Sequence, residues 1–144
     1  MLNAIRKNAL YLAWATALAA TAGSLYFSEV LHLPPCVLCW YQRVFMYPLV
    51  LLLAVGIERR DPGIRRYALP LSLLGFAVAV YHNLLYYKIL PENAAPCTAG
   101  ISCTTLQINW LGFITIPLLS LLGFLAINLA LIIYQPEENN DQRN

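Results

Sequence analysis

The sequence predicts an all-α membrane protein, a bundle of four transmembrane helices that forms a single integral membrane domain over residues 1–144. Of these residues, 60% are hydrophobic and only 11% are charged, and the mean hydropathy is +0.61. Soluble domains average roughly 45–50% apolar residues, so this composition favours the bilayer. The apolar residues gather in four stretches, each near the ~20 residues with which a helix crosses ~30 Å of hydrocarbon. Helices are expected because a spanning segment must satisfy its own backbone groups.

The first helix is expected at residues 9–30. Arg6 and Lys7 precede it, and Ala20-Thr21-Ala22 lies near its end, a pattern that also resembles a signal peptide with its cleavage site. The apolar run continues through residues 25–27 and exceeds the ~7–15 residues that are usual for a signal peptide. We therefore expect an uncleaved first helix.

The second and third helices are expected at residues 40–57 and 67–90. The loop between them, residues 58–66, reads ERRDPGIRR. The fourth helix is expected at residues 111–134, after a loop at residues 91–110. These elements use nearly the whole chain, so no soluble domain is expected.

Basic residues set the expected orientation, because Lys and Arg flank the cytoplasmic ends of membrane helices. They are present before the first helix and four times in loop 58–66, whereas the first outer loop offers none before Arg43 and the connection after the third helix offers only Lys88. We therefore expect a multi-pass protein of the cell (inner or cytoplasmic) membrane. Both termini and loop 58–66 are expected in the cytoplasm, and the other two loops on the extracytoplasmic side. The formal net charge of +2 gives no indication of a nucleic-acid partner.

All four cysteines lie in the two outer loops. Cys36 and Cys39 form a CxxC pair in the first, and Cys97 and Cys103 are separated by five residues in the second. Thiols outside the cytoplasm meet oxidising conditions. Four cysteines allow three disulfide pairings, among which the sequence does not choose. Bridges over such short loops restrict the unfolded chain little, so reactivity is the more economical interpretation.

The residues around Cys39 favour a reactive thiol. Pro34 and Pro35 keep the approach extended, so we expect the helix to begin near Cys39, where free backbone N–H groups stabilise a thiolate. Arg43 follows one turn later on the same face, about 5–6 Å away between Cβ atoms. Its guanidinium favours the thiolate further and can hold negative charge on an organic acceptor. Alternatively, Arg43 simply reaches from the first turn to the lipid headgroups.

Two further residues reach a similar depth on their helices. His82 lies roughly 12 Å below the outer end of the third helix, at a rise of ~1.5 Å per residue. Tyr47 lies eight residues below Cys39. Arg43, Tyr47 and His82 can therefore line one pocket beneath the CxxC pair. The alternative for His82 is a hydrogen bond to a neighbouring helix. No resident metal ion is expected.

The chain resembles the DsbB family of membrane thiol:quinone oxidoreductases. The stretch CVLCWYQR at residues 36–43 is similar to the family's CxxC-plus-arginine signature, and GFITIP at residues 112–117 resembles the opening of its fourth helix. The closely spaced Cys97 and Cys103 are most similar to the BdbC-type branch. The resemblance extends from the first helix to the fourth.

This resemblance implies an enzyme that re-oxidises an extracytoplasmic DsbA-like oxidase of thioredoxin fold and passes the electrons to a membrane quinone, ubiquinone or menaquinone. The family implies that the partner's thiol attacks Cys97 and that Cys103 passes electrons to Cys36. It further implies that Cys39 faces the quinone and that Arg43 helps to bind or activate it.

A quinone is also the acceptor that the redox potentials require of such a system. Oxidases of the DsbA kind have reduction potentials near −120 mV, so their re-oxidation by an ordinary disulfide near −270 mV is uphill by ~150 mV, or roughly 7 kcal/mol for two electrons.

His82 matches the family only by its position near the outer end of the third helix.

Other interpretations of the same features remain. Enzymes of the vitamin K epoxide reductase type also combine four helices with two outer cysteine pairs, but they carry their CxxC on the last helix. A non-enzymatic four-helix protein would hold a structural zinc ion on the cysteines or two inert disulfides. The five residues between Cys97 and Cys103 exceed the ~2–4 that are usual between zinc ligands. A transporter is not indicated, because no acidic residue lies deep in a helix.

Overall fold

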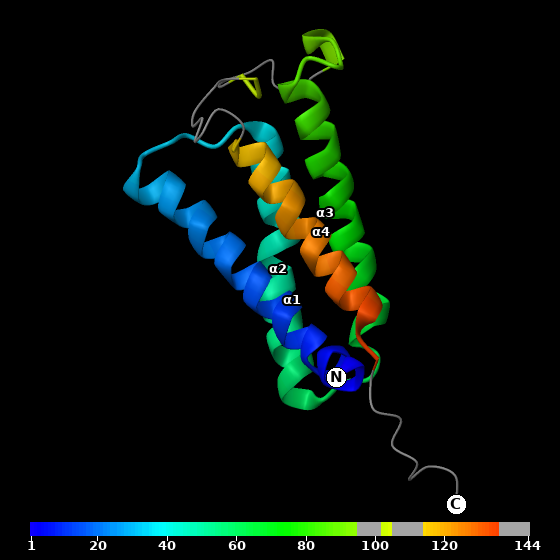
Figure 1. The fold of residues 1–144 in the computed structure, drawn as a ribbon. Helices are drawn as coiled ribbons and strands as arrows, with labels where there is room; N and C mark the ends of the chain where they lie inside the picture. The colour runs from blue at the N-terminus through cyan, green and yellow to red at the C-terminus, as the bar shows by residue number, and fades with distance from the viewer. Residues whose placement is uncertain (95–101, 105–113, 136–144) are drawn as a thin grey trace, which may run out of the picture.

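A computed structural model describes residues 1–94, 102–104 and 114–135 of the chain. Within these residues four long helices form the bundle in Figure 1, namely α1 (Leu2–Leu25), α2 (Val37–Arg59), α3 (Ile64–Tyr86) and α4 (Ile116–Ile133). A π-helical turn, η1 (Tyr26–Val30), continues α1, and a short 3-10 turn, η2 (Glu92–Ala94), follows α3. All four long helices are long and apolar enough to cross a membrane. The predicted fold class, an all-α membrane protein with four spanning helices, is thereby confirmed.

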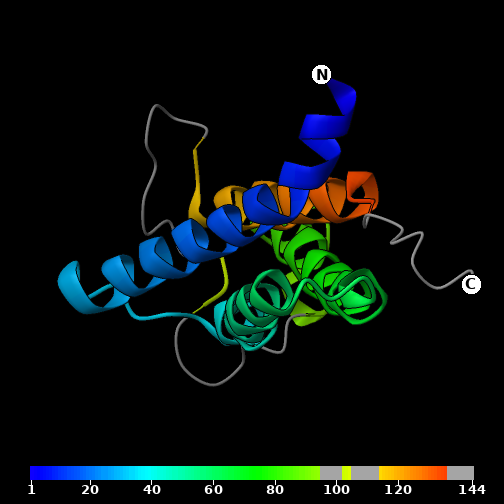
Figure 2. The same ribbon diagram turned by 90° about the horizontal axis from the view of Figure 1, so that it is seen from below.

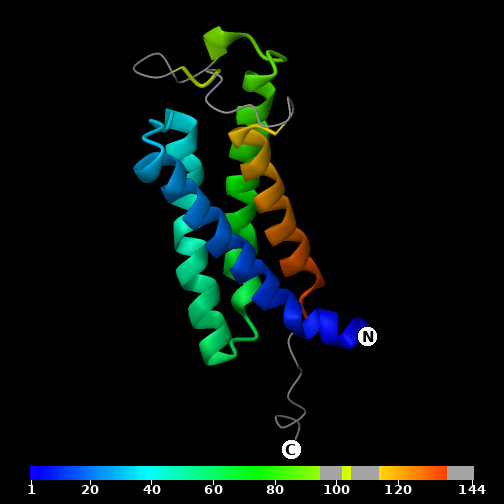
Figure 3. The same ribbon diagram turned by 60° about the vertical axis from the view of Figure 1, so that its left-hand side comes forward.

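The helices form a ring in which α1 and α3 each pack against both α2 and α4. In Figure 2, α2 and α3 are seen nearly along their axes while α1 is seen from its side, so α1 is tilted against them. Its start lies beside the end of α4, where Arg6 donates a hydrogen bond to Gln135, and its end lies beside the start of α2 (Figure 3). Met1 and the α2–α3 connection therefore share one end of the bundle.

Helix α2 begins at Val37, three residues before the expected start at residue 40. Cys36 caps it, because its backbone is extended and its sulfur accepts a hydrogen bond of 3.4 Å from the backbone N–H of Cys39. Helix α4 begins in the same manner, since the side chain of Thr115 accepts a hydrogen bond from the N–H of Leu118. Side-chain caps of this kind satisfy N–H groups that have no partner within the helix.

Helix α3 ends at Tyr86, four residues before the expected end at residue 90. Lys88 has a φ of 56°, in the left-handed region that ends a helix, and the chain then turns. Helix α1 extends further toward the N-terminus than residue 9 and begins at Leu2.

The core lies along the middle of the ring, and apolar side chains also cover its outside. Phe124 of α4 is fully buried against Gly75 of α3, where an added Cβ would lie 2.2 Å from the phenyl ring. On the outer surface, Leu51 is 70% exposed and Val44 61% exposed. A soluble protein rarely presents so extensive an apolar surface, whereas lipid is a suitable solvent for it.

Candidate functional site

The CxxC pair lies at the N-terminus of α2. Cys36 is the capping residue, is buried, and lies outside the spanning helix, whereas Cys39 lies in the first turn and is half-buried. The two sulfur atoms are 2.9 Å apart and both cysteines are free. The described state is therefore a closely spaced dithiol.

The positive end of α2 acts on Cys36 and not, as the sequence led us to expect, on Cys39. The reason is the earlier helix start, which directs the backbone N–H of Cys39 at the Cys36 sulfur. Hydrogen bonding from the Cys39 side chain is the largest influence, and with contributions from His82 and this N–H it lowers the pKa of Cys36 to about 4 against the opposing effect of burial. Cys36 is thus the thiolate of the pair.

His82 of α3 contacts Cys36 from across the helix interface. Its imidazole is only 2% exposed, with Nε2 lying 3.7 Å from the Cys36 sulfur and Nδ1 lying 3.1 Å from Nε2 of Gln42. Because the Gln42 amide donates to Nδ1, the ring hydrogen lies on Nε2 and is directed at the sulfur. A buried chain of three polar groups thus runs from Gln42 to Cys36.

Gln42 was not among the residues predicted from the sequence. It is buried on α2, one turn below Cys39. A polar side chain on a spanning helix is a signal that could have identified it.

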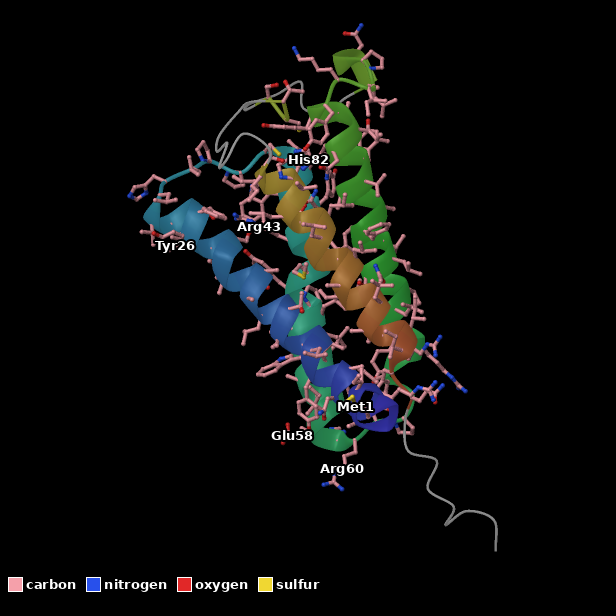
Figure 4. The ribbon with its side chains drawn as sticks, viewed as in Figure 1. Met1, Tyr26, Arg43, Glu58, Arg60 and His82 are labelled. Carbon is pink, nitrogen blue, oxygen red and sulfur yellow. The ribbon has the colours of Figure 1, made fainter. Side chains whose placement is uncertain are left out.

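Arg43 is fixed by the end of α1. Its Nε donates to the Ser24 hydroxyl at 2.9 Å, and one terminal nitrogen donates both to the Ser24 carbonyl at 3.1 Å and to the Ser28 hydroxyl at 2.6 Å. The guanidinium also lies 5.2 Å from the centroid of the Trp40 ring. Figure 4 shows Arg43 and His82 at the same end of the bundle, opposite Met1. Ser28 belongs to η1, and such π-helical turns are frequent at functional sites.

A cavity of about 350 Å³ lies between α1, α2 and α4. Its walls are mostly apolar, and Cys39, Arg43 and Tyr47 are among the residues that line it. The Tyr47 hydroxyl is buried and has no hydrogen-bond partner in the described part of the chain. Among the described residues, His82 and Cys36 are not part of this lining. Of the three residues expected to share a pocket, Arg43 and Tyr47 thus meet at the cavity, whereas His82 lies on the Cys36 side.

Cys103 lies close to the first pair. It is buried in one apolar cluster with Cys36, Leu38 and Leu85. It is disulfide-bonded, and neither Cys36 nor Cys39 is its partner, because both are free. A cysteine in a disulfide offers no thiolate to a metal ion, which speaks against a zinc site made of all four cysteines. Cys97 lies outside the described residues.

Comparisons with known proteins give a consistent result. The sequence profile of the family described as "Disulfide bond formation protein DsbB" matches residues 6–134. The chain is 46% identical over 123 residues to the "Probable disulfide formation protein C 1" of Bacillus cereus (strain ATCC 10987), covering 85% of this chain and 88% of that protein. It is 41% identical over 130 residues to the "Disulfide bond formation protein C" of Bacillus subtilis, covering 90% and 94%. A "Probable disulfide formation protein" of Metapseudomonas resinovorans is 44% identical over 127 residues, covering 88% of each chain. No solved structure matches the chain.

Proposed function

Because this chain belongs to the DsbB family of disulfide bond formation proteins, we propose that it transfers electrons from an extracytoplasmic thiol oxidase to a membrane quinone. The family itself assigns it an oxidoreductase role in disulfide bond formation within the membrane. The proposal adds the donor, the acceptor and the route between them.

The observation that carries the proposal is the asymmetric setting of the two CxxC sulfurs. Cys36 packs with Cys103 in one buried cluster, whereas Cys39 lines the cavity between α1, α2 and α4. A dithiol in this setting can receive electrons through one sulfur and release them through the other. A purely structural disulfide does not require a cavity beside one of its two sulfur atoms.

The first half of the route is thiol–disulfide exchange. The reduced partner attacks Cys97 of a Cys97–Cys103 disulfide, and the electron pair of the broken bond leaves on Cys103. A second partner thiol then resolves the mixed disulfide, so that the partner is oxidised and the outer pair is reduced. Exchange of this kind proceeds by attack of a thiolate on a disulfide sulfur.

The second half delivers the electrons to Cys39. The Cys103 thiolate attacks Cys36 of a Cys36–Cys39 disulfide, so that a Cys103–Cys36 bond forms and Cys39 leaves with the electron pair. Attack of Cys97 on Cys103 then restores the outer disulfide and releases Cys36. The short contact between the sulfur atoms of the CxxC pair allows that bond to form again when both electrons have left.

The residues at the cavity fit a quinone as the acceptor. When bound, a quinone would supply the acceptor for two electrons and two protons and would be released as the hydroquinone. Tyr47 lines the cavity, and its buried hydroxyl, which has no partner among the described residues, would donate to a quinone carbonyl after a turn of the side chain toward the cavity. Arg43 supplies a fixed positive charge close to Cys39, where negative charge develops during transfer. The apolar walls suit a lipid-soluble ring.

The proposed orientation places Cys36, Cys39, Cys97 and Cys103 on the extracytoplasmic side. The arginine-rich α2–α3 connection lies at the end of the bundle that holds Met1, and Glu58 and Arg60 are labelled there in Figure 4. The rule that basic residues remain on the cytoplasmic side then assigns the opposite end, with the start of α2, to the outside.

The test uses the oxidised purified protein, a reduced DsbA-like oxidase and a short-chain ubiquinone or menaquinone. We expect the absorbance of the oxidised quinone to fall, and the Cys39→Ser variant to lose this activity entirely. Glu58→Gln, at the opposite end of the bundle, serves as the matched control and should retain normal activity. Normal turnover of the Cys39→Ser variant would contradict the proposed route.

A further inference from the structure

The reduced CxxC pair and His82 together form a group of potential metal ligands. The two sulfur atoms and one imidazole nitrogen all lie within 4.8 Å of one another. We propose that the reduced protein binds one thiophilic divalent cation, Zn²⁺ in the first instance, through Cys36, Cys39 and His82. The bound cation stops electron transfer, and this second part alone rests on the proposed function.

Two of the three ligand pairs require little change to hold the cation, and the third, Cys39 and His82, lies within 4.8 Å. Tetrahedral zinc, with Zn–S near 2.3 Å and Zn–N near 2.05 Å, separates two sulfur ligands by about 3.8 Å and a sulfur from a nitrogen by about 3.6 Å. The Cys36 sulfur already lies 3.7 Å from Nε2 of His82. The two sulfurs, now 2.9 Å apart, need to separate by about 0.9 Å. Cys39 borders the cavity and has room for this movement.

The chemistry of the site balances without a redox step. The Cys36 thiolate binds as it is, the Cys39 thiol releases one proton as its sulfur binds the cation, His82 contributes a neutral nitrogen, and the metal keeps its charge of two. Three protein ligands leave a fourth position for water or another small ligand. The charge of Arg43 opposes the cation, but the two bound thiolates offset both charges of the metal, and hydrogen bonds to Ser24 and Ser28 hold the guanidinium toward α1.

Gln42 is placed to support the metal-bound form of His82. A histidine that ligates a metal through Nε2 carries its hydrogen on Nδ1, and this hydrogen usually finds an acceptor. The Gln42 amide lies 3.1 Å from Nδ1 and presents its oxygen there after a half-turn of the amide group. Loss of such a supporting contact usually weakens metal binding about 10- to 100-fold, so Gln42→Leu should weaken it and Gln42→Glu should not.

The site exists only in the reduced protein. Oxidation joins the two sulfurs in a disulfide and removes both thiolate ligands at once. A cation bound here also covers Cys39, the sulfur that borders the cavity. Zinc would therefore hold the enzyme in its reduced form and leave the oxidised form untouched.

The binding test uses the chain with Cys97→Ser and Cys103→Ser, so that only the CxxC pair offers thiols. The protein is reduced in detergent, freed of reductant without oxygen, and titrated with Co²⁺, whose visible absorption reports tetrahedral thiolate ligation; Zn²⁺ affinity is then measured against a chromophoric chelator. We expect one cation per chain, no binding after oxidation or in Cys36→Ser, and at least tenfold weaker binding in His82→Ala. His32→Ala, which alters an exposed histidine, is the matched control and should bind normally.

Absence of binding, or unchanged affinity in His82→Ala, would overturn the proposed site. If the two serine substitutions reduce the helical circular dichroism, the full chain is titrated instead, and its stoichiometry must fall by one cation in Cys36→Ser. Quinone turnover is measured separately, with and without Zn²⁺. Zn²⁺ should inhibit when it is present during turnover, because the reduced enzyme forms then. A protein that binds zinc but reduces no quinone refutes the proposed function and retains the site. A protein that reduces quinone but binds no zinc refutes the proposed site and leaves the proposed function intact.

Discussion

Replacing Cys39 by alanine is expected to raise the pKa of Cys36 toward its ordinary value of 9.0. In the reduced protein, hydrogen bonding from the Cys39 side chain is the largest of the influences that lower this pKa to about 4. Alanine removes the donor, whereas serine keeps a hydroxyl that donates to the same sulfur. Cys39→Ala and Cys39→Ser therefore form a matched pair that separates the hydrogen bond from the loss of the second thiol.

The expected change is large and has a defined sign. At pH 6 a thiol of pKa about 4 is about 99% thiolate, whereas one of pKa about 9 is only about 0.1% thiolate. A lower pKa also makes each thiolate a weaker nucleophile, by a factor of roughly 200 over five units at a Brønsted coefficient near 0.45. Cys36 should thus react about fivefold faster at pH 6 with Cys39 present than with alanine, and far more slowly above pH 9.

The assay is alkylation of Cys36 by iodoacetamide from pH 4 to pH 10, followed by mass spectrometry of the peptide, with Cys97→Ser and Cys103→Ser in all chains. The rate should be nearly constant above pH 5 in the parent and close to it in Cys39→Ser. It should rise up to about pH 9 in Cys39→Ala. A parent profile that itself rises through pH 8 to 9, or identical profiles for serine and alanine, would refute this account of the thiolate.

Three further changes test the packing and the cavity. Gly75→Ala places a Cβ 2.2 Å from a buried phenyl ring and should lower the free energy of unfolding in detergent by about 1–3 kcal/mol, whereas Gly23→Ala, with no atom within 4 Å, should not lower it. Tyr47→Phe removes a single hydroxyl and should raise the KM for a short-chain quinone roughly two- to tenfold in the quinone reduction assay, at about 0.5–1.5 kcal/mol for one hydrogen bond. Ser24→Ala removes the acceptor of Arg43 Nε and should raise the same KM about tenfold without changing the helical circular dichroism.

The positions of the helices along the chain could be predicted from the sequence, because the length and hydropathy of a segment determine whether it spans the bilayer. The rotation of each helix about its axis could not. Hydropathy is similar all around a helix that faces lipid on one side and other apolar helices on the other. The contact between His82 and Cys36, and the hydrogen bonds between Arg43 and α1, depend on that rotation and on the tilt of α1.

The start of α2 escaped prediction for a different reason. Helix caps are recognised in sequences by Ser, Thr, Asp or Asn, and cysteine is not among the residues that signal one. Two prolines before Cys36 indicated only that the chain was extended up to that point. The cap depends on the sulfur of Cys36 accepting from the N–H of Cys39, which the spacing of a CxxC pair permits but does not require.

This three-residue difference in the helix start decides what the CxxC pair can do. With Cys36 as the cap, the sulfur that the helix end stabilises lies with Cys103 and His82, and the first turn of α2 carries Cys39 to the cavity. An exchange reaction that breaks a Cys36–Cys39 bond at Cys36 releases its electron pair on the cavity side, close to Arg43. A helix that began at Cys39 would leave Cys36 in the preceding loop, and no helix geometry would then hold the two sulfurs in different surroundings. The direction of electron flow that we propose therefore rests on where the cap places the two sulfurs, with Cys36 beside Cys103 and Cys39 at the cavity.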